Sequence, residues 1–167
     1  MTPADGAPLE IRRLGDRDEA GACARMMAAS EPWITLRRDA DAALAILTDP
    51  GRESYVAFLQ GELVGFLILV MHGAFVGYIQ SVCVAPGRRS LGLGRRLMDF
   101  AEERIFRETP NVFLNVSSFN PEARRLYERL GYEVVGELRD YIVRGHSEIL
   151  MRKTTGPLAE FARRQPG

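Results

Sequence analysis

The sequence predicts a single α/β (α+β) domain with a mixed, mostly antiparallel central sheet and elements in the order βααβββαβαββ. Two helix-like segments follow a short first strand. Three strand-like runs then succeed one another with only turns between them, which is typical of consecutive antiparallel strands. From residue 93 onward, helix-like and strand-like segments alternate before a closing hairpin. The chain of 167 residues, 46% of them apolar, is long enough to fill one core.

The N-terminal half contains the first strand, two helices and the three successive strands. Asp16 is expected to cap the first helix, with Glu19 three residues later as its capping-box partner. The turn at 48–51, Thr-Asp-Pro-Gly, ends the second helix. The expected elements are a strand at 9–13, helices to about residue 29 and over 39–47, and strands at 54–59, 63–71 and 76–84.

The C-terminal half begins with a loop rich in Arg and Gly. The helix after it, at about 93–107, places apolar residues at core-facing spacing. Asn120 caps a further helix that has Pro121 in its first turn, where the missing N–H costs nothing, and Gly131 ends it. The remaining expected elements are strands at 112–116, 132–143 and 147–153, the last two forming a hairpin around Arg144-Gly145.

Composition limits the classes of partner. Lys+Arg and Asp+Glu both number 22, so the basic excess of a nucleic-acid-binding protein is absent and no nucleic acid is expected. The longest apolar run, 63–71, is about half of a ~20-residue membrane span, so no membrane partner is expected either. Cys23 and Cys83 form no CxxC pair and the N-terminus has no signal-like apolar run, which favours a cytoplasmic protein without a metal site.

The two ends of the chain are rich in small and polar residues with Pro and Gly. They read as tails at 1–8 and 157–167. No repeat, linker or low-complexity tract interrupts the chain between them. We therefore expect one catalytic or binding domain over 9–156.

The loop after the strand that ends at Val84 has the composition of an anion site. Gly92 and Gly94 precede a helix, whose first N–H groups lack intrahelical partners and carry about half a positive charge. Glycine lets a phosphate approach the backbone closely. Four arginines surround this end, at 88, 89, 95 and 96. From these residues alone, an ordinary helix start with solvated arginines stays an equal alternative.

Two nucleotide-binding motifs are excluded by residue type. A P-loop requires Gly-Lys-Ser/Thr at the helix start, and this loop has no lysine. A Rossmann fingerprint requires a third glycine three residues after Gly94, where Leu97 stands. The residues therefore favour neither ATP nor NAD.

The segment VCVAPGRRSLGLG, 82–94, resembles the acetyl-CoA signature of the GCN5-related N-acetyltransferase (GNAT) family, Arg/Gln-x-x-Gly-x-Gly/Ala after a V-x-V-x-P strand end. A second segment, NVSSFNPEARRLYERLGYE at 115–133, is similar to the family's second signature. The resemblance begins at the Val64-Gly65-Phe66 strand and covers about 90 residues. It implies a sheet splayed between its fourth and fifth strands, acetyl-CoA as cofactor, and transfer of acetyl to a primary amine by direct attack in a ternary complex.

The resemblance also implies roles for individual residues. Backbone groups of the strand end and loop would bind acetyl-CoA, and the amide of Val82 would polarise the acetyl carbonyl. Asn120 would contact the pantetheine arm, although it also reads as a plain helix cap. Tyr127, seven residues later on the same helix face, would protonate the CoA thiolate, and its alternative is a core aromatic. The implied cofactor-binding residues are Val82, Cys83, Val84, Arg89, Ser90, Leu91, Gly92, Leu93, Gly94, Arg95 and Asn120.

The general base is not evident. Asn115 stands where N-terminal acetyltransferases have Glu or His, and Tyr78 stands where histone-type relatives have Glu. We expect a water relay oriented by Tyr78, Gln80 or Asn115. His72 ends a strand and reads as solvent-facing. The residues expected to meet the acceptor, each with a plain surface or structural alternative, are Trp33, Tyr78, Gln80, Asn115, Tyr141 and His146, with Asp140 and Glu148 beside the closing loop.

The closing segment LRDYIVRGHSEILMRK, 138–153, is similar to the end of the ribosomal-protein alanine and other N-terminal acetyltransferases. This similarity favours a peptide N-terminus as acceptor, whereas Asn115 favours another amine. A small-molecule amine acetyltransferase, or a catalytically weak acyl-CoA-binding or sensor domain, stays open. The expected partners are acetyl-CoA and an amine acceptor, and a homodimer is left open.

Overall fold

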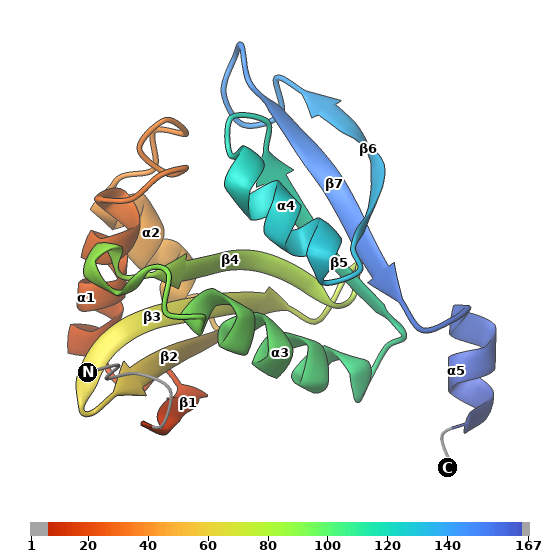
Figure 1. Ribbon diagram of the computed structural model, residues 1–167, viewed down its shortest axis with the longest axis horizontal. Coiled ribbons are helices and arrows are strands. Elements are labelled where there is room, and N and C mark those ends of the chain that lie inside the picture. The colour runs from red at the N-terminus through yellow and green to blue at the C-terminus, as the bar shows by residue number, and fades with distance from the viewer. Residues whose placement is uncertain (1–6, 165–167) are drawn as a thin grey trace. The chain divides into compact units, whose positions relative to one another are not determined.

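The computed structural model describes residues 7–164 and confirms the predicted order of elements (Figure 1). The strands are β1 (Leu9–Arg13), β2 (Glu53–Leu59), β3 (Glu62–Val70), β4 (Tyr78–Val84), β5 (Asn111–Ser117), β6 (Glu133–Arg139) and β7 (Ser147–Thr154). The helices are α1 (Arg17–Ala28), α2 (Ala40–Leu47), the 3-10 turn η1 (Pro86–Arg88), α3 (Leu93–Phe106), α4 (Pro121–Arg129) and α5 (Leu158–Arg164).

The strands form one mixed sheet in the order β1-β2-β3-β4-β5-β7-β6. The pairs β1-β2, β2-β3, β5-β7 and β6-β7 are antiparallel, and β4 runs parallel to β5. The parallel ladder joins only Tyr78 to Phe113 and Ile79 to Leu114, and it ends there although both strands continue. This short ladder is the splay expected between the fourth and fifth strands.

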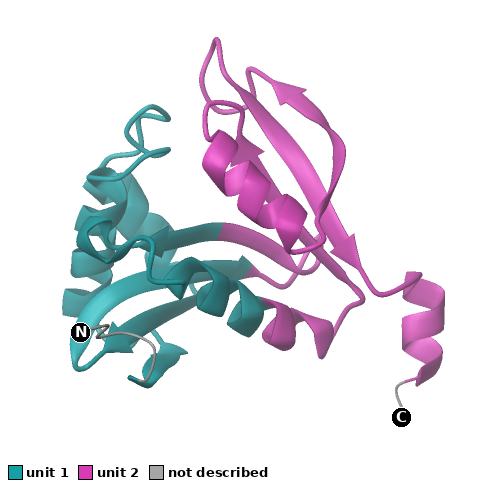
Figure 2. Cartoon of the chain, viewed as in Figure 1, with its two compact units in different colours: residues 1–69, 81–101 teal, residues 70–80, 102–167 magenta. Residues whose placement is uncertain are grey.

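The chain divides into two compact units (Figure 2). Unit 1 contains residues up to 69 together with 81–101, and its core joins α1 and α2 to β2, β3 and the end of β4. Asp16 accepts from the Glu19 amide at 2.9 Å, which is the predicted cap of α1, and Asp39 caps α2 in the same way by accepting from the Ala42 amide at 2.8 Å. The core residues are Cys23, Ala24, Met27, Trp33, Ala43, Leu47, Val56, Phe66, Ile68 and Cys83.

The first half of α3 packs closely against β3 in unit 1. A Cβ at Gly65 would lie 2.5 Å from the Cys83 carbonyl oxygen and 3.2 Å from the Leu97 side chain. Only glycine fits between these neighbours. An edge-to-face contact between Tyr55 and Phe100, with centroids 5.0 Å apart, extends the same interface along α3.

Unit 2 contains residues 70–80 and those from 102 onward. Buried apolar residues of its strands include Val112, Leu114, Val116, Ile149 and Met151. Glu102, in the second half of α3, ties this helix to the closing hairpin: it accepts from the Tyr132 hydroxyl at 3.0 Å and from Lys153 at 2.8 Å. Asn120 caps α4 by accepting from the Ala123 amide at 3.3 Å, as predicted.

Two differences from the sequence prediction lie near the C-terminus. The strand expected to reach Val143 ends at Arg139, because Asp140 adopts a φ of 51° and its carboxylate accepts from the Gly145 amide at 2.6 Å. This loop replaces the last rungs of the hairpin. The expected tail at 157–167 contains α5, none of whose residues is buried. The expected tail at 1–8 lies almost wholly outside the described residues.

Candidate active site

The glycine loop of unit 1 has the backbone of an anion-binding turn. Ser90 and Gly92 adopt φ values of 68° and 72°, and α3 begins one residue later at Leu93. Left-handed residues next to a helix start turn successive N–H groups to one side, which forms a concave donor surface. A left-handed Ser costs about 1 kcal/mol or more, and such strain concentrates at functional sites. These φ values are compatible with the anion site predicted for the loop, which stays a prediction.

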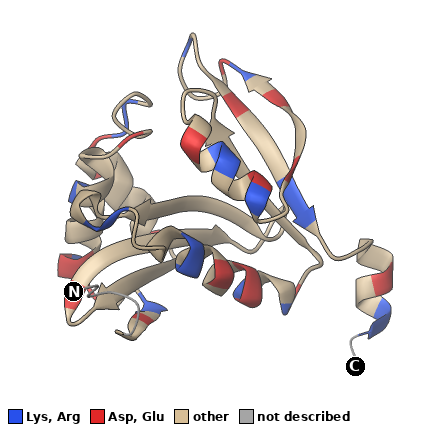
Figure 3. Ribbon diagram, viewed as in Figure 1, with Lys and Arg blue, Asp and Glu red and all other residues tan. Residues whose placement is uncertain are grey.

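Arginines concentrate around this loop, and Figure 3 shows the basic residues along it and at the start of α3. Arg89, Arg95 and Arg96 are exposed. Arg88 forms an ion pair with Glu62, so the charge of this one of the four loop arginines is neutralised by a carboxylate. Three exposed guanidinium groups beside a helix N-terminus suit a ligand with several phosphate charges.

The end of β4 supplies the rest of the predicted cofactor strand. Val82 and Val84 are half-buried and alternate with the buried residues Ser81 and Cys83. The Ala85 amide donates to the Val64 carbonyl at 2.8 Å and closes the pairing at this end. Burial raises the pKa of the Cys83 thiol to about 12, so this cysteine is protonated at neutral pH and is no nucleophile.

Helix α4 of unit 2 carries Asn120 and Tyr127. Capping uses the Oδ1 atom of Asn120, so a cofactor contact by this side chain would use Nδ2. The Tyr127 ring packs edge to face on Tyr132, with centroids 6.0 Å apart. Burial raises the pKa of Tyr127 to about 12. The hydroxyl therefore keeps its proton at neutral pH, which a general acid requires, while the ring also fills a packing position.

A row of polar side chains crosses unit 2 from β4 to β7. Asn115 donates through Nδ2 to the Tyr78 hydroxyl at 3.0 Å, while its Oδ1 is buried without a hydrogen-bond partner. The Ser117 hydroxyl donates to Oε1 of Glu148 at 2.7 Å. Both of these side chains are buried: Ser117 is 3% exposed and Glu148 4%. The structure thus brings together Tyr78 and Asn115 from the predicted set.

Sequence reasoning missed the importance of Ser117 and the burial of Glu148, which it placed beside a surface loop. Two signals were available. Alternation along β5 puts Asn115 and Ser117 on one face, and Glu148 stands in an otherwise apolar run, EILM. Neither signal reveals the contact itself, because the pairing of Ser117 with Glu148 depends on the register between β5 and β7.

The other expected acceptor residues are scattered. Trp33 is 7% exposed, with its ring 6.5 Å from that of Phe66, and belongs to the unit 1 core. Tyr141 is 61% exposed on the closing loop, and His146 packs edge to face on Phe119 at 4.8 Å. Gln80 is half-buried on β4, and His72 is exposed as expected.

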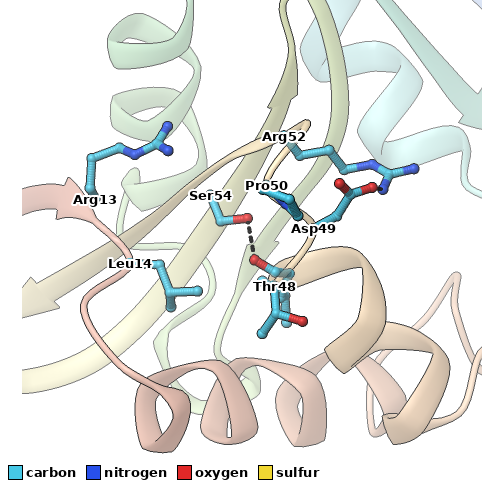
Figure 4. A pocket seen from close by; sticks show the side chains of 8 residues that line it. Arg13, Leu14, Thr48, Asp49, Pro50, Arg52 and Ser54 are labelled. Atoms are coloured by element: carbon cyan, nitrogen blue, oxygen red, sulfur yellow. Dashed lines mark hydrogen bonds and ion pairs between the residues drawn. The ribbon is translucent and has the colours of Figure 1, made fainter.

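A small surface pocket of unit 1 lies where α2 meets β2 (Figure 4). The Ser54 hydroxyl donates there to the Leu47 carbonyl at 2.9 Å, and Arg52 pairs with Asp49. These contacts anchor the turn after α2. None of the predicted site residues lines this pocket, whose walls are Arg13, Leu14, Leu47, Thr48, Asp49, Pro50, Arg52 and Ser54.

Two further properties concern the described residues alone. Within 7–164, no group of three or more His, Cys, Asp or Glu side chains is arranged to hold a metal ion. None of the helices in this range is long and apolar enough to span a membrane.

The profile of the acetyltransferase (GNAT) family matches residues 20–132, which include the glycine loop and all but the last residue of the second signature segment. This chain belongs to the GNAT acetyltransferase family. It is therefore an acyltransferase, and acetyl-CoA is the cofactor of its family. The donor set of the loop, backbone N–H groups with exposed arginines, is suited to the phosphates of that cofactor.

Relatives of this GNAT chain include two N-alpha-acetyltransferases. One, the RimI protein of Mycobacterium tuberculosis, is 29% identical over 165 residues, which cover 92% of this chain and 97% of that protein. The other, from Sulfurisphaera tokodaii, is 31% identical over 111 residues, which cover 58% of this chain and 66% of the relative. The fold is similar to that of an aminoglycoside 6'-N-acetyltransferase crystallised with coenzyme A, with a TM-score of 0.70 at 19% identity, over 95% of this chain and 99% of that one.

Proposed function

We propose that this protein transfers the acetyl group of acetyl-CoA to a primary amine by direct attack, and that its acceptor is the N-terminal amine of a peptide or protein. The observation that carries the transfer is the match to the acetyltransferase family over residues 20–132, within which Tyr127 stands at the position of the family's acid. Two further observations support the acceptor: the closing segment 138–153, and the near full-length similarity to an N-alpha-acetyltransferase.

Each unit has its own task in this proposal. In unit 1, the N–H groups from Arg89 to Arg95 bind the pyrophosphate, and the main chain of Val82 and Val84 binds the pantetheine arm as an added strand would. The Val82 amide donates to the acetyl carbonyl oxygen. Loss of such a donor typically costs ~10²- to 10³-fold in rate. Acetyl-CoA supplies an acyl group activated as a thioester.

In unit 2, Asn120 positions the pantetheine arm and Tyr127 donates a proton to the leaving sulfur. Tyr78, Gln80 and Asn115 orient the acceptor, and Tyr141 and His146 border it from the closing loop. The segment 9–156 would suffice for these tasks, because α5 contributes no buried residue. Trp33 is assigned to the core rather than to the acceptor.

The second candidate acceptor is a small-molecule amine. It is favoured by Asn115, which lacks the acid or imidazole that N-terminal acetyltransferases place at this position. An acceptor screen separates the candidates. Release of free CoA thiol is followed with acetyl-CoA and, in turn, short peptides with free N-termini, the same peptides with blocked N-termini, a polyamine and an aminoglycoside.

We expect thiol release with the free peptides, together with a mass gain of one acetyl group at the N-terminus, and none with the blocked peptides. Turnover of the small amines alone would transfer the assignment to the second candidate. Binding of acetyl-CoA without turnover of any amine would overturn the enzymatic proposal and favour a sensor domain.

A further inference from the structure

Glu148 is a buried carboxylate near the start of β7, directly before the apolar residues Ile149, Leu150 and Met151. It is 4% exposed, and its neighbours Ile149 and Met151 are buried. Burying a carboxylate is unfavourable unless hydrogen bonds or charges compensate, so such a group needs a specific reason for its place. The Ser117 hydroxyl donates to Oε1 at 2.7 Å and fixes the orientation of the carboxylate.

A second acceptor lies on the same face of β5. Asn115 precedes Ser117 by two residues, and its Oδ1 is buried with no hydrogen bond. Its Nδ2 donates to the Tyr78 hydroxyl at 3.0 Å, so the nitrogen end of the amide faces that tyrosine. Ser117, which bonds the Glu148 carboxylate, stands two residues from Asn115 and about 7 Å along β5, so the amide side chain and the carboxylate lie on one face of the sheet at neighbouring positions.

We propose that Asn115 and Glu148 bind the ammonium group of the acceptor amine, and that Glu148 removes its proton before attack. The inference rests on the proposed function and supplies the base that the sequence did not reveal. An ammonium group has three donors and no acceptor, and the two side chains offer acceptor oxygens. An asparagine cannot take a proton, whereas a carboxylate can.

The ammonium nitrogen transfers one proton to a Glu148 oxygen and becomes a neutral amine. Its lone pair forms the C–N bond to the acetyl carbon, the C–S bond breaks, and Tyr127 gives its proton to the departing sulfur. The nitrogen loses its second proton, which returns through water to Tyr127, and the proton on Glu148 leaves to solvent. The products are the N-acetyl amine, CoA thiol and one released proton.

This chemistry also selects the amine. An α-amino group has a pKa of about 7.7–8.0 and a lysine side chain one of about 10.4, so a single carboxylate deprotonates the former far more readily near neutral pH. Side-chain amines are therefore expected to be poorer acceptors than peptide N-termini.

The other charged or titratable side chains on the Glu148 face of β4, β5 and β7 are Tyr78 and Arg152. On β6, the residue paired with Glu148 is the apolar Leu138.

Glu148→Gln tests the proposal, because glutamine keeps the size of the side chain and can still accept from Ser117. With a free-N-terminus peptide, kcat/KM at pH 7 is expected to fall ~10²- to 10³-fold. The loss should shrink as the pH rises past the pKa of the amine, where the neutral nucleophile forms without a base. The matched control is Glu137→Gln, an exposed residue of β6 that should leave both the rate and the pH profile unchanged.

If Glu148→Gln keeps the wild-type pH profile and a rate within threefold of wild type, the inference is overturned. The proposed function is not affected by that result, because it is supported by turnover of the peptide by the wild-type enzyme. Absence of wild-type turnover would instead overturn the proposed function. In that case calorimetric titration of the same peptide decides, since equal affinity for wild type and Glu148→Gln also removes the ammonium site. If Glu148→Gln does not fold, Asn115→Leu replaces it, with an expected rise in the peptide KM of about tenfold and unchanged acetyl-CoA affinity.

Discussion

Replacement of Tyr127 by phenylalanine tests the acid assigned to the leaving sulfur. The substitution deletes the hydroxyl and keeps the ring, whose edge-to-face contact with Tyr132 at 6.0 Å can persist. We therefore expect little change in the free energy of unfolding. A variant that retains its packing isolates the contribution of the hydroxyl to the chemical step.

The structure limits the size of the effect. Burial raises the pKa of Tyr127 to about 12, whereas a thiol has a pKa of about 8.5, so the tyrosine is the weaker acid by about 3.5 pK units. Proton transfer to the sulfur is therefore uphill for this tyrosine, which reduces the rate gain that it can supply as a general acid. We expect the low end of the general-acid range, about 10²-fold in kcat.

The assay is thiol release with saturating acetyl-CoA, under conditions where chemistry limits the rate. Because a pKa of about 12 keeps the hydroxyl protonated between pH 6 and 9, the ratio of wild-type to Tyr127→Phe rates should be constant across this range. Affinity for acetyl-CoA should change little, as expected for an interaction formed in the transition state. A fully active Tyr127→Phe enzyme would refute the acid role and leave Tyr127 as a packing residue.

Three other predictions concern unit 1. Gly94→Ala should weaken CoA binding by tenfold or more in calorimetry, without loss of stability because Gly94 is at a helical position that accepts alanine. The control is Gly87→Ala, whose Cβ would meet open space and which should leave the affinity for CoA unchanged. Burial raises the pKa of Cys23 and of Cys83 to about 12, so native protein should not react with a disulfide reagent at pH 8, and the contribution of these two thiols to stability should be constant at neutral pH and fall as the pH rises through 9. Trp33→Ala should lower the free energy of unfolding by about 3–5 kcal/mol in denaturant titration, and full stability with a raised acceptor KM would restore its expected contact with the acceptor.

The sign of the alkaline effect follows from linkage. A thiol whose pKa is raised on folding stays neutral in the native state while the unfolded chain ionises near its ordinary value of 9.0. The unfolded chain therefore binds fewer protons between pH 9 and 12, and each such cysteine reduces stability by up to about 1.4 kcal/mol per pH unit there. Replacement of both cysteines by alanine should flatten the slope between pH 9 and 10, whereas at higher pH the raised pKa values of Tyr127 and Tyr132 maintain a slope of the same sign.

Local chemistry could be predicted from the sequence because it depends on neighbours a few residues away. The caps at Asp16, Asp39 and Asn120 each bond an amide three residues later, so the helix starts were correct. The end of β6 was wrong for the converse reason. Tyr141 to Val143 are compatible with a strand, but the turn of Asp140 and its bond to the Gly145 amide compete successfully with the last rungs.

The acceptor side of the site was harder to predict because it depends on strand register. A surface hairpin loop was the simplest interpretation of Glu148, and only its pairing with Ser117 places it inside the sheet. Trp33 shows the opposite error. Its position between two helices suggested an exposed connection, yet the ring reaches Phe66 in the core. In both cases the burial of one side chain is decided by residues more than 30 positions away.

The acid and the base proposed for this enzyme make different pH signatures. Tyr127 contributes no titration between pH 6 and 9, so we assign a rise of kcat/KM in that range to the proton-accepting side of the reaction. Tyr127→Phe should therefore lower the whole profile without moving its midpoint, whereas Glu148→Gln should move the midpoint to the pKa of the amine. In the double variant, the midpoint should follow Glu148→Gln and the plateau should follow Tyr127→Phe. A midpoint that moves with Tyr127→Phe would mean that one coupled group serves both ends of the reaction, and the separation of acid from base would be wrong.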